Sequence, residues 1–224
     1  MEMEIVLPSE VPVMTLPETV FFPQALMPLH IFEPRYREML RNVLATNRLF
    51  AVAGLDPLGE PGQEQPHRVA TVGIVRACQG NDNGTSNLLL QGLTRVRIIS
   101  IAQAEPYRRI QVQALASEPG GKPAANRALQ SHTRRLIDEK ARLGGRVPED
   151  FVRFLATVKD PETFVDLAVF NLCENAGLKQ RLLEILDVNR RLRVYNGYLR
   201  REVTQLALER RLQGDLPDDY IERN

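Results

Sequence analysis

The spacing of apolar residues divides the chain into a strand-rich first half and a helical second half. In the first half, apolar residues gather in short runs or alternate with polar residues, which is typical of β-strands. Short strands at this spacing predict a small closed or nearly closed barrel. The predicted strands are 11–16, 19–22, 49–55, 68–78, 88–92, 93–101 and 107–116, with an Asn- and Gly-rich turn at 79–87.

One helix is predicted inside the strand-rich half, over residues 32–47. Pro34 lies near its start, where the missing N–H costs no helical hydrogen bond. Apolar residues then recur three and four positions apart, which gives the helix one face to bury. They are Tyr36, Met39, Leu40, Val43 and Leu44.

The second half predicts five helices, the first two over 126–143 and 148–158. The third begins at Asp160-Pro161-Glu162, with Asp as the N-cap and Pro at the first helical position. The fourth covers 179–186. Asp187 is expected to cap the fifth and longest helix, which ends at Gly214.

A change in composition separates the two halves at a Pro- and Gly-rich stretch over 117–124. We therefore predict an α+β fold, with a barrel that contains one inserted helix followed by a helical bundle that ends in a long helix. The expected domains are a barrel domain at 1–118, a linker at 119–125, a helical bundle at 126–214 and an acidic tail at 215–224.

Composition narrows the class of protein. The 224 residues are 43% hydrophobic and 25% charged, with a formal net charge of +1, so composition alone argues neither for nucleic acid nor for an anionic membrane as a partner. The N-terminus has no long apolar run, and no stretch reaches the ~20 apolar residues of a membrane span. Cys78 and Cys173 form no disulfide framework, so we expect a cytoplasmic protein.

The sequence offers no strong motif for catalysis. The P-loop pattern is absent, and we interpret Gly120-Gly121-Lys122, which is followed by proline, as part of the linker. His30, His67 and His132 lie in three separate segments, without the short spacing of zinc ligands. There is also no G-x-S-x-G nucleophile elbow. We therefore expect no catalytic residue, no cofactor and no metal, although folding could still gather some of these side chains.

His30 and Glu33 stand three residues apart and have two interpretations. As a functional pair they would act as acid and base or as ligands. As structural residues, Glu33 favours the start of the following helix and His30 bonds to backbone, and we favour this alternative. Arg35 and Arg37 likewise either fix loops to that helix or bind peptide carboxylates and carbonyls.

The last helix carries an excess of positive charge. Residues 188–211 contain seven arginines and two glutamates, a net of +5. Such a face could bind nucleic acid or an acidic partner. Aromatic residues beyond Tyr195 and Tyr198 are missing from it, so we favour a solvated face.

Several segments resemble the Lon N-terminal domain, the substrate-binding module of an ATP-dependent protease that also occurs as a stand-alone protein. The likeness is carried by four segments in the same order along the chain. They are Leu16–Leu40 with Glu33-Pro-Arg-Tyr36, Val72–Val75 together with the strand pair around Leu90-Gln-Gly-Leu-Thr-Arg-Val-Arg-Ile98, Pro161–Leu167, and Lys179–Asp187.

This resemblance implies a PUA-like β-barrel followed by a helical bundle, without the ATPase and protease domains. It implies a non-enzymatic module that binds unfolded or specific polypeptides, or an adaptor for an ATP-dependent protease, and it allows a homo-oligomer. The polypeptide-binding candidates come from the first resembling segment and its helix: Phe21, Phe22, His30, Phe32, Arg35 and Tyr36. Two alternatives stay open: RNA binding by a PUA-like barrel, and a small-molecule or hydrolase site around His30.

Overall fold

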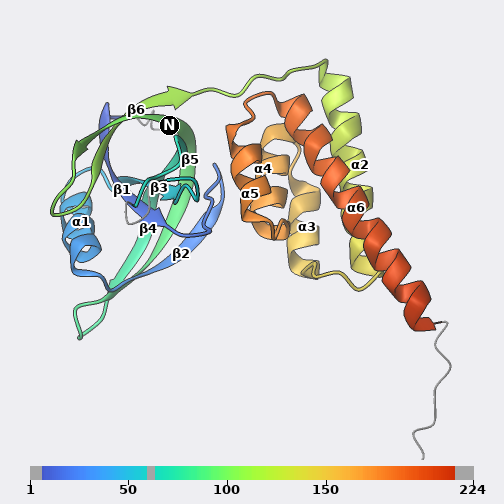
Figure 1. The fold of residues 1–224 in the computed structure, drawn as a ribbon, viewed down its shortest axis with the longest axis horizontal. Helices are drawn as coiled ribbons and strands as arrows, with labels where there is room; N and C mark the ends of the chain where they lie inside the picture. Colours follow the sequence, from blue (N-terminus) through green and yellow to red (C-terminus); the bar gives the residue numbers. More distant parts are fainter. Residues whose placement is uncertain (1–6, 60–63, 215–224) are drawn as a thin grey trace, which may run out of the picture. The chain divides into compact units, whose positions relative to one another are not determined.

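The computed structural model describes residues 7–59 and 64–214, and the predicted acidic tail at 215–224 lies outside this part. The chain forms two compact units. Unit 1 comprises the chain up to Glu118 together with Asp166–Leu186, and unit 2 comprises Pro119–Val165 and the chain from Asp187 onward. The described residues contain six strands and six helices, so the fold is α+β (Figure 1).

All six strands belong to unit 1 and form one mixed sheet in the order β2-β5-β4-β3-β1-β6, with a further pairing between β5 and β6. These pairings make a closed ring of β5, β4, β3, β1 and β6, and leave β2 attached to β5 alone. Among these six strands, β1 and β3 form the one parallel pair. The strands are β1 Glu10–Leu16, β2 Leu26–Ile31, β3 Leu49–Gly54, β4 Val69–Gly80, β5 Ser86–Gln103 and β6 Arg109–Leu115.

The inside of the ring is filled by small and β-branched side chains, which suit its narrow interior. The buried residues of this core are Val11, Val13, Leu49, Ala51, Ala53, Ala70, Val72, Val96 and Ile110.

Helix α1, Pro34–Leu44, forms part of the connection between the parallel strands β1 and β3. The predicted apolar face is confirmed, since Tyr36, Met39, Leu40 and Val43 are buried. The Tyr36 hydroxyl donates to Thr15 O and accepts from Thr15 N, both at 3.2 Å, and so attaches the helix to β1.

The prediction of a strand over 19–22 is wrong. This segment pairs with no strand of the described residues, and it crosses against the sheet instead: Thr71 Oγ1 donates to Phe21 O at 2.6 Å, and Gln24 N donates to Gly92 O at 2.9 Å. A Cβ at Gly92 would lie 2.1 Å from Phe22 O, so only glycine allows the crossing backbone to come this close. The sequence analysis also missed β2 and divided the continuous β5 into two strands.

Two helical segments complete unit 1: the part of α4 (Pro161–Leu172) from Asp166 onward, and α5 (Ala176–Glu184). A buried ion pair connects α4 to the barrel, because Arg95 Nη2 of β5 lies 2.6 Å from Asp166 Oδ1, and each side chain is 1% exposed. Arg95 Nε also donates to Leu183 O at 3.0 Å.

Unit 2 consists of α2 (Pro123–Arg142), α3 (Glu149–Thr157), the first turn of α4 and the long α6 (Val188–Gly214). Both predicted helix caps are confirmed: Asp160 Oδ2 accepts from Thr163 N, and Asp187 Oδ1 accepts from Arg190 N, each at 2.8 Å. Helices α2 and α6 pack side by side (Figure 1). Within the described residues, no helix has the length and apolar character to cross a membrane.

Candidate functional site

Strand β2 presents a row of exposed side chains on one face. Its inward side chains Met27 and Ile31 are buried, whereas Leu26, Pro28 and His30 are exposed, as the two-residue period of a strand requires. Phe32 continues the row just after the strand. Leu26 is 52% exposed and Phe32 is 61% exposed. We call Leu26, Pro28, His30 and Phe32 the β2 surface.

Two aromatic rings of the β2 surface stack on each other. The rings of His30 and Phe32 lie 6.0 Å apart with an angle of 23° between their planes. His30 Nδ1 is 2.7 Å from Asn87 Oδ1 of β5, so the amide oxygen accepts a hydrogen bond from Nδ1–H and fixes the ring. Nε2 is then the ring nitrogen that remains to accept a hydrogen bond. The pair offers a partner a fixed apolar platform with one polar atom.

Arg35 and Glu64 form a two-point ion pair close to the start of α1. Arg35 Nη1 and Nη2 donate to the two carboxylate oxygens of Glu64 at 2.7 and 3.0 Å. Arg35 Nε donates to Glu33 at 2.9 Å, and the guanidinium carbon lies 4.6 Å from the Tyr36 ring centre. The hydrogen bond from Arg35 lowers the pKa of Glu64, and the same bond raises the pKa of Arg35.

A polar hollow of about 360 Å³ lies beside this ion pair. Its walls include Tyr36, Tyr107 and Arg108 together with Arg35 and Glu64. Burial raises the pKa of the Tyr36 hydroxyl, so this group stays protonated at neutral pH. The Glu64 carboxylate lies 2.7 Å from Arg35 Nη1 and 3.8 Å from Arg108 Nη1, so it offsets part of the positive charge that the hollow could offer an anion.

The six predicted polypeptide-binding residues do not share one surface. Phe21, Phe22 and Tyr36 are buried, with exposed fractions of 1%, 0% and 5%, so they belong to the core and a partner cannot reach them without opening the fold. Arg35 is partly exposed but engaged in ion pairs. His30 and Phe32 are exposed and adjacent. The structure therefore brings only these last two together as accessible groups.

Leu26 and Pro28 belong to this surface but were not among the six candidates, because strand β2 was not predicted. The signal for a strand was present, since polar or proline positions alternate with Met27, Leu29 and Ile31 in this run.

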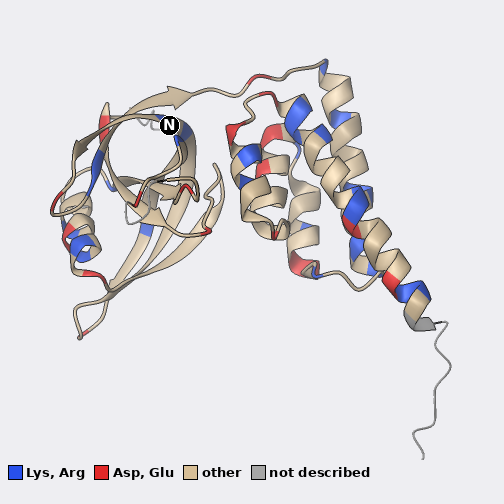
Figure 2. Cartoon of the chain, in the orientation of Figure 1, with Lys and Arg blue, Asp and Glu red and all other residues tan. Residues whose placement is uncertain are grey.

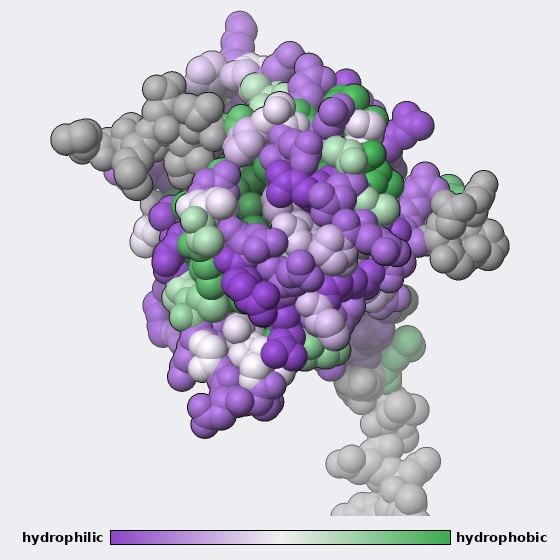
Figure 3. Space-filling view, turned by 90° about the vertical axis from the view of Figure 1, so that its left-hand side faces the viewer, coloured by the Kyte–Doolittle hydropathy of each residue, from purple (hydrophilic) through white to green (hydrophobic). Residues whose placement is uncertain are grey.

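On the face that carries α1, hydrophilic residues dominate and hydrophobic residues form small areas (Figure 3).

The chemical motifs weighed from the sequence remain separate in the fold. Glu33 bonds to Arg35 rather than to His30, so those two residues form no acid–base pair. Among the described residues, no group of three or more His, Cys, Asp or Glu is placed to hold a metal ion. At the Gly-Gly-Lys stretch, a Cβ on Gly120 would lie 1.7 Å from a carboxylate oxygen of Asp187. The Asp187 carboxylate therefore lies against the Gly120 backbone, where its negative charge opposes phosphate binding.

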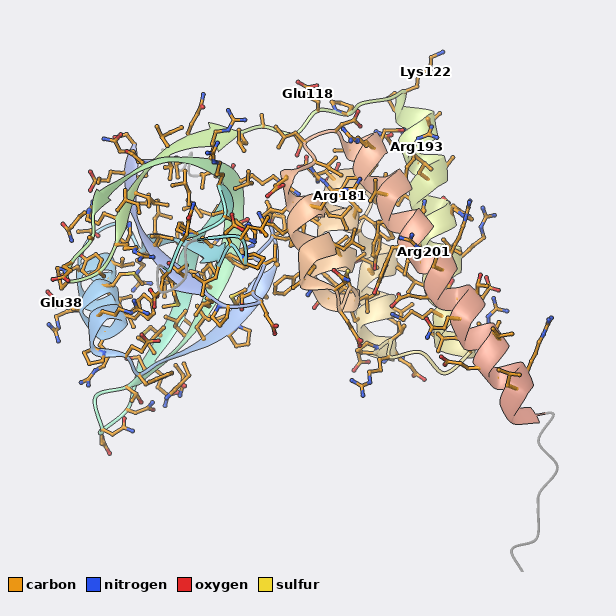
Figure 4. The ribbon with its side chains drawn as sticks, in the orientation of Figure 1. Glu38, Glu118, Lys122, Arg181, Arg193 and Arg201 are labelled. Carbon is orange, nitrogen blue, oxygen red and sulfur yellow. The ribbon has the colours of Figure 1, made fainter. Side chains whose placement is uncertain are left out.

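A second feature lies in unit 2, where one face of α6 carries five exposed arginines. At 100° per residue they fall within about 100° of the helix circumference, and Glu202 and Glu209 point elsewhere. In the described chain none of the five forms an ion pair: Arg193 donates to Asn189 and Arg200 to His132, which are neutral acceptors. Lys and Arg positions are blue along α6 in Figure 2, and Figure 4 labels Arg193 and Arg201 on this helix. We call Arg190, Arg193, Arg200, Arg201 and Arg211 the arginine stripe.

Comparison with known proteins places the fold among protease substrate-binding domains. A family model described as the ATP-dependent protease La (LON) substrate-binding domain matches residues 10–201. The Lon protease of Dictyoglomus thermophilum is 29% identical over 215 residues, which are 95% of this chain and 27% of that protein. The Lon protease of Desulfosudis oleivorans is 26% identical over 219 residues, 95% of this chain and 26% of that protein. The chain therefore spans about a quarter of the length of these relatives.

Two solved structures share the fold. The N-terminal domain of Mycobacterium avium complex Lon protease superposes with a TM-score of 0.67 at 17% identity, covering 87% of this chain and 98% of that one. A Lon N-terminal domain protein from Xanthomonas campestris gives a TM-score of 0.57 at 20% identity, covering 83% and 96%. At these identities the likeness shows a common fold.

Proposed function

Because this chain belongs to the ATP-dependent protease La (LON) substrate-binding domain family, we propose that it recognises substrate polypeptides through the β2 surface. The observation that carries the proposal is the exposure of Leu26 on β2 and of Phe32 just after it, at 52% and 61%, beside a strand that pairs on one side only among the described strands. Rows of exposed apolar side chains mark interaction sites in soluble proteins.

The polypeptides bound would be unfolded, because exposed apolar side chains are what an unfolded chain presents and a folded one buries. The closed ring of five strands would be the PUA-like barrel that the resemblance implies. The protein would act without catalysis of its own, as a recognition module or an adaptor for an ATP-dependent protease, in the cytoplasm. Binding of each polypeptide would be modest, since ordering a flexible partner costs conformational entropy.

Of the six residues predicted from the sequence, the proposal keeps His30 and Phe32 as direct contacts. It gives Phe21, Phe22 and Tyr36 a supporting role, because they are buried in the core of unit 1. Arg35 would orient the start of α1 through its ion pair with Glu64.

The test is a fluorescence anisotropy titration of a labelled, permanently unfolded polypeptide. We expect saturable binding that Phe32→Ala weakens several-fold. Leu58→Ala is the matched control, since Leu58 is an exposed apolar residue of unit 1, 93% exposed, outside the β2 surface. Absence of binding, or equal loss in both variants, would contradict the proposal.

RNA binding is the second candidate, and the arginine stripe favours it. Residues 119–165 and 187–214 contain sixteen Lys or Arg and nine Asp or Glu, a net of +7. Phosphate contacts would make such binding steeply salt-dependent. An RNA hairpin added as a competitor in the same titration, at low and high salt, separates the two functions. Displacement of the polypeptide by RNA at low salt would favour this alternative.

A further inference from the structure

Strand β2 has one edge without a strand partner in the described chain. It pairs with β5 over Leu26–Ile31, and it is the end member of the strand order. An edge strand carries a row of backbone N–H and C=O groups that can pair with another extended chain.

The register tells which backbone groups face this free edge. Gly92 N donates to Ala25 O, so Ala25 and Gly92 form a hydrogen-bonded pair. In an antiparallel ladder, such pairs alternate with pairs whose backbone groups point away from each other. The backbone groups of Met27, Leu29 and Ile31 therefore point towards β5. The backbone groups of the alternate residues Leu26, Pro28 and His30 point to the free edge.

The residues with outward-facing backbone groups are the same ones that form the β2 surface. A chain added to this edge would thus lie beside the exposed side chains of Leu26 and His30 and close to Phe32. Pro28 carries no N–H, so it removes one donor from the middle of the edge. Proline and short length are the features by which natural edge strands avoid pairing with copies of themselves.

We propose that an extended segment of the substrate polypeptide adds to the free edge of β2 as a further strand. This proposal rests on the proposed function and specifies its mode of recognition. The Leu26 and His30 N–H groups donate to carbonyls of the added segment, and the carbonyls of Leu26, Pro28 and His30 accept from its N–H groups. Every second side chain of the segment then packs on the β2 surface.

The substrate class follows from this geometry. Backbone hydrogen bonds are the same for every sequence, so they allow many polypeptides to bind, while the apolar row favours segments with apolar residues at alternate positions. A native protein hides such segments inside its own sheets. An unfolded chain exposes them, and binding therefore selects against folded proteins.

The first test uses a nine-residue peptide in which valine and threonine alternate between terminal lysines. One version is N-methylated at the valines and another at the threonines. The N–H groups of a strand alternate between its two edges, so each version blocks one edge only. We expect one version to lose binding at least about tenfold and the other to keep it within about twofold. Equal behaviour of the two versions would overturn the proposal.

The second test changes the edge itself. His30→Pro removes an N–H from the free edge, whereas His30→Ala keeps it and removes only the ring. We expect His30→Pro to bind the unmethylated peptide more weakly than His30→Ala does. Pro28→Ala supplies the missing donor and should bind about twofold to tenfold more tightly than the wild type. Circular dichroism and thermal unfolding of each variant verify that the barrel is intact.

The outcomes distinguish a failure of strand addition from a failure of the proposed polypeptide binding. If the unfolded polypeptide binds but neither methylation pattern nor Pro28→Ala matters, edge addition is wrong and recognition through side chains stands. If no polypeptide binds, both fail. If Pro28→Ala produces only concentration-dependent dimers in sedimentation, the edge pairs with a second copy and the proposal is overturned.

Discussion

At the scale of single residues, two buried charges connect the barrel to α4 within unit 1. Arg95 and Asp166 are each 1% exposed on their side chains and lie 2.6 Å apart. Replacing Arg95 by methionine leaves the Asp166 carboxylate buried beside an apolar group. We expect the free energy of unfolding to fall by about 3–5 kcal/mol, measured by urea denaturation.

The double variant Arg95→Met/Asp166→Leu tests the reason for that loss. Removing both charges also removes the cost of the uncompensated carboxylate, so the double variant should be more stable than Arg95→Met alone. If the double variant loses as much unfolding free energy as Arg95→Met and Asp166→Leu lose together, the two side chains do not act as a pair.

A second residue-scale prediction concerns pH. His132 Nε2 accepts hydrogen bonds from Arg200 at 2.9 and 3.2 Å, so the fold holds the neutral imidazole. Burial, together with the charges of Arg200 and Arg135, lowers the pKa of His132 below its ordinary value of 6.5. The unfolded chain binds a proton on His132 more tightly than the folded chain does. The contribution of neutral His132 to the stability of the fold is therefore complete above pH 6.5 and is lost as pH falls through the folded-state pKa.

The His132→Gln variant keeps an acceptor for Arg200 and cannot titrate. We expect the thermal midpoint of the wild type, relative to His132→Gln, to fall as pH is lowered from about 7.5 to 5. A constant difference between the two midpoints over this range would show that His132 is equally protonated in the folded and unfolded chains.

At the scale of elements, the crossing of the 21–25 segment over β5 depends on Gly92. A Cβ there would lie 2.1 Å from Phe22 O, and the backbone of both segments would have to move. We expect Gly92→Ala to lower the free energy of unfolding by about 2 kcal/mol or more, measured by chemical denaturation. Gly80→Ala is the matched control in a strand, because a Cβ at Gly80 meets nothing within 4 Å, and it should change stability little.

The same elements show how far sequence reasoning reaches. Helices were predicted well because their signals are local: the face of α1 repeats every three to four residues, and Asp160 and Asp187 are N-caps whose bonds lie within one turn. Strand signals are weaker where pairing is distant in sequence. Phe21 and Phe22 look like strand residues, but their environment is set by Thr71 and Gly92, some 50 and 70 residues away.

The candidate site shows the same limit. The segment that contains it could be located from the sequence, and the exposed pair His30 and Phe32 was among the residues chosen. Which of the apolar residues would be buried depended on the crossing of Phe22 over Gly92 and on the edge position of β2, and both are long-range features.

At the scale of the whole molecule, the two features that could bind a macromolecule differ in chemistry and lie in different units. The β2 surface is largely apolar and belongs to unit 1, and the arginine stripe is cationic and belongs to unit 2. Apolar contacts and backbone hydrogen bonds respond weakly to ionic strength, whereas contacts between arginines and phosphates respond strongly. Varying the salt concentration and removing arginine charges therefore show whether the β2 surface or the arginine stripe binds the macromolecule.

The variant Arg193→Gln/Arg200→Gln/Arg201→Gln removes three charges from the arginine stripe and leaves the β2 surface unchanged. If recognition of unfolded polypeptide belongs to the β2 surface, this variant should bind the labelled polypeptide within about twofold of the wild type between about 0.05 and 0.5 M salt. The binding of an RNA hairpin should fall at low salt, and its dependence on salt should flatten, because fewer counterions are released. Loss of polypeptide binding in this variant, with Phe32→Ala unaffected, would instead assign recognition to α6.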